Sequence, residues 1–245
     1  MTQTMSPARQ SRIGVGLALL VMAAWLAFHL GGIFLFDITF AWPAPLEAAA
    51  LVVLQTWLSV GLYIVAHDAM HGSLWPTSRA AGDRLGQAAV WLYAGFSYRD
   101  LIRMHHAHHR LPGSAEDPDF SPEMPHRLLP WYARFMRTYL TTRQAVTMLL
   151  RVTLYLLLGA RLENIVLFFA VPGLLSSLQL FYFGTYLPHR HKEGEAGGFA
   201  DHHRARSNAY GYLGSLLSCF HFGYHHEHHL HPGVPWWRLP ALRRA

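Results

Sequence analysis

Long apolar runs constrain the fold of this chain of 245 residues more than any other feature of its sequence. The run 13–36 contains no charged residue and a single histidine, His29, and a second apolar run follows at 46–66. A bilayer core about 30 Å thick needs about 20 apolar residues in a helix. Charged residues make up 14% of this chain, against about 25% in a typical soluble domain. These runs therefore predict helices that cross a membrane.

Two further runs complete a set of four. The run 162–187 has Glu163 at its start, and the shorter run 145–160 contains Arg151, which we expect to snorkel or to face protein. The runs 85–98 and 209–222 are too short to span easily, so we expect buried, re-entrant or interfacial helices there. We predict an all-α integral membrane protein with one domain, residues 1–245, and four transmembrane helices at 13–36, 46–66, 145–160 and 162–187.

The basic residues lie almost entirely on one side of these four spans. If the spans form hairpins around 37–45 and around Arg161, then residues 1–12, 67–144 and 188–245 share one side, which holds 18 of the 20 Lys and Arg residues. The positive-inside rule makes that side cytoplasmic, together with both termini. This distribution accounts for the formal net charge of +6. We therefore expect contact with anionic lipid and no nucleic-acid partner.

Histidine is the second anomaly, with 18 residues against 14 Asp and Glu. Because residues i, i+3 and i+4 share one face of a helix, three motifs present clustered imidazoles. Eight imidazoles exceed the four ligands of a zinc ion and suit two metal ions, although imidazole binds Zn, Cu, Fe and Ni alike. The single cysteine, Cys219, excludes cysteine-based metal sites and an internal disulfide. The motifs are HxxxH at His67 and His71, and HxxHH at His105, His108 and His109 and again at His225, His228 and His229.

The register of the two HxxHH motifs is fixed by the residues that follow them. Starting the pattern at His106 or His226 would require histidine where Arg110 and Leu230 stand. We therefore expect His106 and His226 to lie off the ligand face, as supporting or surface residues.

His189 follows the last span and is the preferred ninth ligand, with His221, one turn before His225, as the alternative. We expect His29, His126, His202 and His203 to be structural or surface residues.

Carboxylates beside the motifs are candidates to hold the ligands in place. Ligating histidines commonly donate their second N–H to a carboxylate or a carbonyl. Asp68, Asp117 and Glu227 lie close enough in sequence to accept such bonds. For Asp117 the alternative, that it only shapes a loop with Asp119 around Pro118, is equally open. A cytoplasmic helical cap, residues 67–144 and 188–245, would then hold the di-metal site at the membrane surface.

Beyond the spacing, longer motifs carry a resemblance to a known family. HxxxH, HxxHH and HxxHH around four spans resemble the membrane-bound di-iron desaturase and hydroxylase superfamily. The closer resemblance is to the carotenoid ketolases, or β-carotene 4-oxygenases, and it rests on four segments: His67-Asp-Ala-Met-His-Gly-Ser, Glu116-Asp-Pro-Asp-Phe, Tyr186-Leu-Pro-His-Arg and His221-Phe-Gly-Tyr-His-His-Glu-His-His-Leu-His-Pro.

The resemblance implies two iron ions held by histidine and O2 as co-substrate, in a bacterial inner membrane. It also implies oxidation of C4 in the β-ionone ring to a ketone, from β-carotene to echinenone and canthaxanthin, and from zeaxanthin towards astaxanthin. Gly14-Val-Gly16 lies inside a span and is no dinucleotide fingerprint, and no iron–sulfur motif occurs. A separate ferredoxin-type donor is therefore expected on the basic face. The sequence gives no indication of the oligomeric state.

Other functions share the same histidine spacing. A carotenoid 3-hydroxylase and a fatty-acyl desaturase or hydroxylase stay open on spacing alone. A metal transporter is disfavoured, because transporters place their ligands near the bilayer midplane, whereas these clusters follow the spans. Aromatic residues near the motifs are candidates to line a tunnel for a polyene: Trp75, Trp91, Tyr93, Phe96, Tyr98, Phe222 and Tyr224.

Overall fold

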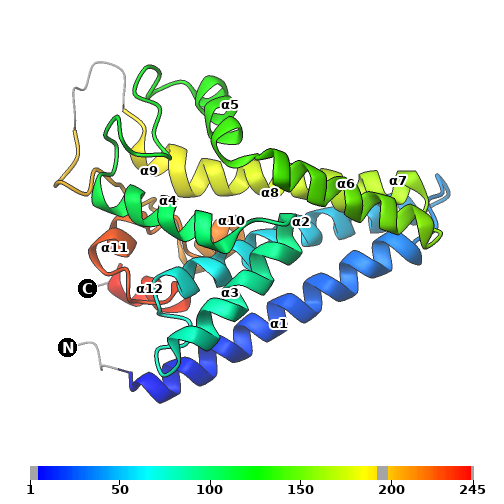
Figure 1. Ribbon diagram of the computed structural model, residues 1–245, viewed down its shortest axis with the longest axis horizontal. Helices are drawn as coiled ribbons and strands as arrows, with labels where there is room; N and C mark the ends of the chain where they lie inside the picture. Colours follow the sequence, from blue (N-terminus) through cyan, green and yellow to red (C-terminus); the bar gives the residue numbers. More distant parts are fainter. Residues whose placement is uncertain (1–4, 192–197, 244–245) are drawn as a thin grey trace.

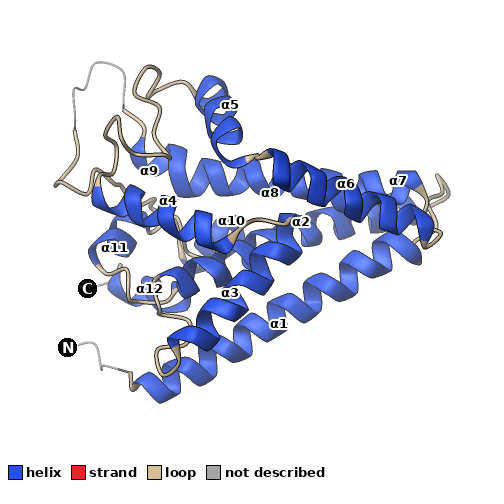
Figure 2. Cartoon of the chain, in the orientation of Figure 1, coloured by secondary structure: helices blue, strands red, loops and turns tan. Residues whose placement is uncertain are grey.

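Three long helices run the length of the molecule (Figure 1). The computed structural model describes residues 5–191 and 198–243, and within those ranges it contains helices and loops but no strand (Figure 2). α1 (Pro7–Phe34), α2 (Ala44–Met70) and the continuous helix Leu162–His189 are each long and apolar enough to cross a membrane. The sequence predicts that both termini are cytoplasmic, but the extreme termini, residues 1–4 and 244–245, lie outside the described residues.

The third long helix is not a regular α-helix throughout. It consists of α7 (Leu162–Ile165), the π-helical segment η1 (Val166–Ala170), α8 (Val171–Phe181), a second π-helical segment η2 (Tyr182–Tyr186) and α9 (Leu187–His189). π-helical turns are rare and often occur at functional sites. Here η2 ends three residues before His189, so the change of helical register precedes a candidate ligand.

The first two predicted spans are confirmed as helices: the first begins earlier than predicted and ends two residues earlier, and the second is longer at both ends. α1 begins six residues early, because the Ser6 side chain accepts a hydrogen bond from the Arg9 backbone N–H and Pro7 occupies the first turn. α2 continues past residue 66 to Met70, and His71 is its C-cap residue. His67 therefore lies on the last turn of a membrane-length helix and His71 directly beyond it.

The run predicted as a fourth span forms α6 (Thr142–Leu157), capped by Thr141. At 1.5 Å per residue its 16 residues extend about 24 Å, less than the membrane core. Arg151 faces protein, since its guanidinium donates to the carbonyl oxygens of Leu92 and Trp91 at 2.7 and 2.6 Å. The opposite face of α6 is apolar and exposed, with Leu149 and Leu150 each 64% accessible.

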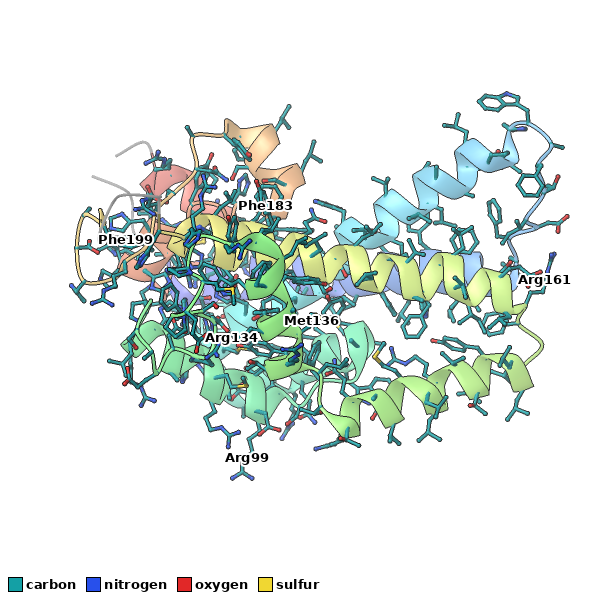
Figure 3. All side chains as sticks on the ribbon, turned by 90° about the horizontal axis from the view of Figure 1, so that it is seen from above. Arg99, Arg134, Met136, Arg161, Phe183 and Phe199 are labelled. Atoms are coloured by element: carbon teal, nitrogen blue, oxygen red, sulfur yellow. The ribbon has the colours of Figure 1, made fainter. Side chains whose placement is uncertain are left out.

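The two predicted hairpin loops meet at one end of the molecule. Arg161, between α6 and α7, forms ion pairs with Asp37, in the loop after α1, at 3.1 Å and with Glu163 at 2.6 Å. Figure 3 shows Arg161 at the end opposite Phe199, which lies among the loops of the histidine-rich end.

The shorter helices gather towards the histidine-rich end (Figure 1). The run 85–98 forms most of α3 (Arg79–Ala94), which packs so closely on α2 that a Cβ on Gly86 would lie 2.7 Å from that of Ala69. The run 209–222 yields only the eight residues of α10. The remaining elements are α4 (Tyr98–Arg110), α5 (Leu128–Tyr139), α10 (Tyr212–Cys219), α11 (His225–Leu230), η3 (Trp236–Arg238) and α12 (Leu239–Leu242).

Candidate metal centre

The two HxxHH helices each divide their histidines between two groups. At 100° per residue, positions i and i+4 lie about 40° apart on a helix, whereas position i+3 lies about 60° to the other side of i. On α4, His105 and His109 accordingly point to one group and His108 to another. On α11 the assignment is reversed, because His228 joins the group of His105. Each group therefore receives two histidines from one HxxHH motif and one from the other, and the two motifs form two adjacent groups.

All nine histidines predicted as ligands belong to these two groups. Within each group one ring nitrogen from every member lies within 4.8 Å of the others. We call them the five-histidine group and the four-histidine group. The five-histidine group comprises His67, His71, His105, His109 and His228. The four-histidine group comprises His108, His189, His225 and His229.

The spacing of the ring nitrogens fits metal coordination. Nε2 of His67 lies 3.1 Å from Nε2 of His228, and Nε2 of His71 lies 2.7 Å from Nε2 of His105. In the four-histidine group, Nε2 of His229 lies 3.0 Å from Nε2 of His225. Two nitrogens bound at right angles to a metal at about 2.1 Å each would lie about 3.0 Å apart. Ring nitrogens at this spacing are compatible with ligands that share a metal ion.

Most of the imidazoles, though not His108, are held in the neutral form that binds metal. Burial, reinforced by repulsion between neighbouring imidazoles, lowers the pKa of His71 and of His109 to about 2. The same causes hold the pKa values of His105, His225 and His229 well below the ordinary value. Neutral rings offer a lone pair without first releasing a proton.

Asp117 fixes the orientation of His108. Its carboxylate oxygens lie 3.0 Å from Nδ1 of His108 and also accept the backbone N–H groups of Gly113 and Asp119 at 2.7 and 2.9 Å. Because a carboxylate accepts, Nδ1 carries the proton and Nε2 presents its lone pair to the four-histidine group. Burial opposes protonation of His108, but Asp117 outweighs it and raises the pKa of His108. Asp117 therefore contacts the site as well as shaping the loop.

His189, rather than His221, lies among the other imidazoles. Nδ1 of His189 donates to the Arg204 carbonyl at 2.7 Å, which leaves Nε2 buried and without a hydrogen-bond partner in the described chain. This orphaned lone pair faces the four-histidine group. His221 is buried against Tyr224 and Trp236 and belongs to neither group.

The other predicted supporting residues take different positions. Asp68 lies 3.6 Å from Nδ1 of His67 and accepts the backbone N–H of Trp236, so it stands beside the five-histidine group. Glu227 instead binds the Ser207 hydroxyl and Arg243. Neither partner belongs to the histidine groups.

His106 and His226 lie off the ligand face, as the register predicts. Nε2 of His106 donates to the Met70 carbonyl at 3.2 Å, and Nε2 of His226 lies 2.8 Å from Asp201. The four histidines predicted as structural or surface residues lie in neither group. His29 is buried against Trp25 with Nε2 2.8 Å from the Tyr155 hydroxyl, His126 and His202 are exposed, and His203 is half-buried.

A cavity of about 280 Å³ leads to the imidazoles. His105, His108 and His225 form one wall, and apolar side chains from α3, α5, α6 and the helix Leu162–His189 form most of the rest. Three of the seven aromatic residues predicted to line a tunnel do so: Tyr93, Phe96 and Phe222. Trp75, Trp91, Tyr98 and Tyr224 pack elsewhere. The cavity is thus mainly apolar and reaches the histidines.

Among the polar residues in the cavity wall that were not predicted from the sequence as site residues, Asp119 and Tyr139 lie beside His108 and Asp119 respectively. The Tyr139 hydroxyl donates to Asp119 Oδ1, and Asp119 Oδ2 lies 3.8 Å from Nδ1 of His108. Burial, with the charge of Asp117, raises the pKa of Asp119 to about 6. Its position two residues after Asp117, a predicted supporting carboxylate, could have marked Asp119 as a site residue. Nothing in the sequence marks Tyr139, which is 20 residues further along the chain.

Comparison with known proteins identifies relatives over nearly the whole chain. The family model for fatty acid desaturase matches residues 41–151 and 135–245. Beta-carotene ketolases of two Paracoccus strains are 50% and 47% identical, covering 91% and 95% of this chain and 89% and 93% of their own lengths. A zeaxanthin 4-ketolase of Chlamydomonas reinhardtii is 37% identical over 97% of this chain and 55% of its own.

Proposed function

This chain belongs to the fatty acid desaturase family, and on that premise we propose that it is a β-carotene ketolase. It oxidises the C4 methylene of a β-ionone ring to a ketone, giving echinenone and then canthaxanthin from β-carotene, and it carries zeaxanthin towards astaxanthin. The observation that carries the proposal is the apolar cavity that ends on three imidazoles of a nine-histidine cluster. The relative named zeaxanthin 4-ketolase supports the choice of C4 over other carbons.

We propose that the metals are two iron ions and that the nine histidines of the two groups are their ligands. When bound, iron supplies the O2 chemistry that no protein side chain provides. The protein holds neutral imidazoles in place and presents the ring carbon to them. Asp117 keeps the proton of His108 on Nδ1, and the Arg204 carbonyl does the same for His189. The apolar wall excludes bulk water from the reacting carbon.

The overall reaction takes two rounds at one carbon. In each round one O2, two electrons and two protons are consumed: one oxygen atom is inserted into a C–H bond and the other leaves as water. The first round gives the 4-alcohol. The second gives a geminal diol, which loses water to leave the ketone. C4 is allylic to the ring double bond, so its C–H bonds are comparatively weak.

We further propose that the electrons come from a ferredoxin-type protein that docks on the basic side of the molecule. Four transmembrane helices would then place the histidine groups on the cytoplasmic side of a bacterial inner membrane. The exposed leucines of α6 support its contact with lipid, and the Arg161–Asp37 ion pair supports a shared side for the two hairpin loops.

Expression in bacteria that accumulate β-carotene tests the activity. We expect the pigment to turn from yellow-orange to red, with 4-keto products identified by mass spectrometry. A His225→Ala variant, expressed to the same level in the membrane fraction, is the matched control and should make no ketone, because His225 belongs to the four-histidine group and lines the cavity. Unchanged carotenoids, or products hydroxylated at C3 alone, would refute the proposal.

A further inference from the structure

Asp119 is the one carboxylate among the described residues that line a mainly apolar cavity. Asp119 lines the cavity together with Tyr139 and with Phe135, Met136 and Leu140 of the α5 segment. α5 crosses the helix Leu162–His189 near the histidine-rich end, where Figure 3 labels Met136. A purely hydrocarbon substrate offers this carboxylate no partner, and burying an unpaired charge is costly.

The two oxygens of Asp119 have different surroundings. Oδ1 accepts the hydrogen bond of the Tyr139 hydroxyl, while the Asp119 carbonyl accepts the Trp131 indole N–H at 2.7 Å. These two bonds fix both the side chain and the backbone. Oδ2 accepts no hydrogen bond from the described residues, and its distance to Nδ1 of His108, 3.8 Å, is too long for one. Oδ2 is therefore held in a fixed orientation and can still accept a hydrogen bond.

Support of His108 does not account for this acceptor. Asp117 already takes the Nδ1 proton of His108 at 3.0 Å, and an imidazole has only one proton to give on that nitrogen. Asp119 is thus a second carboxylate beside the His108 ring, which needs only one to accept its Nδ1 proton. Its free oxygen lies beside His108, a wall residue at the imidazole end of the cavity.

We propose that Asp119 Oδ2 accepts a hydrogen bond from a hydroxyl group on the ring that is being oxidised, and that Tyr139 is the positioning residue that orients it. The hydroxyl is either the one on C3 of a hydroxylated ring or the one that the first round leaves on C4. A hydroxyl–carboxylate hydrogen bond is short and stronger than a neutral one, so it favours oxygenated rings over the bare hydrocarbon. This inference rests on the proposed function.

The test measures substrate preference rather than activity alone. Purified wild type, Asp119→Asn and Tyr139→Phe are given equal mixtures of β-carotene and zeaxanthin, and the ratio of their kcat/KM values is read from the products. We expect the ratio of kcat/KM for zeaxanthin to kcat/KM for β-carotene to fall about tenfold in both variants, equivalent to about 1.4 kcal/mol. With β-carotene alone, the 4-hydroxy intermediate should accumulate.

Tyr132→Phe is the matched control. It removes a hydroxyl from the same helix, bonded to Ser177 at 2.7 Å, and Tyr132 does not line the cavity. An unchanged preference in Asp119→Asn and Tyr139→Phe would overturn the inference. So would an equal loss on both substrates accompanied by lowered metal content, because that result assigns Asp119 to the support of His108. A wild type that makes no ketone would instead refute the proposed function.

Discussion

At the scale of single residues, the candidate site depends on which nitrogen of each imidazole carries its proton. His108 and His189 both donate through Nδ1, one to the Asp117 carboxylate and the other to the Arg204 carbonyl. Both therefore present Nε2 to the same group. Partners of this kind fix the orientation of a ligand before the metal binds, and they raise its basicity.

The substitution Asp117→Asn tests this role. Asparagine keeps the shape but can present an N–H instead of an acceptor to His108, so we expect metal affinity to fall about 10- to 100-fold. Metal per protein, measured after dialysis against a weak chelator, checks the result. Asp100→Asn is the control, because Asp100 pairs on the surface with Arg103. Wild-type metal retention in Asp117→Asn would leave Asp117 with a loop-shaping role only.

At the scale of helices, α1 and the helix Leu162–His189 meet at a glycine. Phe168 packs so closely on Gly32 that a Cβ there would lie 2.7 Å from its Cγ, whereas a Cβ on the neighbouring Gly31 would meet nothing within 4 Å. Asn164 reinforces the contact, since its amide lies 3.1 Å from the Gly32 carbonyl and 2.8 Å from that of Phe36. The first of these bonds satisfies a carbonyl group that the end of α1 leaves free, and the second holds the loop that follows the helix.

Replacing each of the two neighbouring glycines with alanine should change the stability of the protein in opposite directions. Gly32→Ala forces α1 away from Phe168 and should destabilise the protein by about 1–3 kcal/mol. Gly31→Ala should leave stability unchanged or raise it by up to about 1 kcal/mol, because alanine favours the helix. Thermal unfolding in detergent, with both variants beside the wild type, makes the comparison. Equal Tm values for the two variants would contradict the close contact.

At the scale of the whole molecule, the two ends have different chemistry. One end carries the hairpin loops joined by the Arg161–Asp37 ion pair, and the other carries the nine imidazoles and most of the short helices (Figure 1). α2 and the helix Leu162–His189 both deliver histidines to the second end. If a membrane lies between the two ends, all nine imidazoles are on the same side of it.

Cysteine labelling tests this orientation. Phe40 is 98% exposed in the loop after α1, and the Arg103 side chain is 76% exposed on α4. We expect a membrane-impermeant maleimide to label Phe40→Cys only in right-side-out vesicles and Arg103→Cys only in inside-out vesicles. The unsubstituted chain is the background, because Cys219 is buried and its pKa is raised by that burial. Labelling of both variants in the same vesicles would refute the topology.

The sequence by itself determined the features that depend on local periodicity. Apolar runs of sufficient length located the three long helices and α6, and the spacing of His105, His108 and His109 required a common helix. The same spacing, followed at 100° per residue, already contains the division into two groups. Resemblance in longer motifs indicated the family that the comparisons confirm.

Tertiary packing decided what residues distant in the chain do to one another. It brought His189 rather than His221 to the four-histidine group, because the helix from Leu162 ends there while His221 packs under Trp236. It also set Tyr139 against Asp119 and opened the cavity beside them. Helix periodicity fixes the face on which a side chain lies, but only the packing of helices fixes what that face meets.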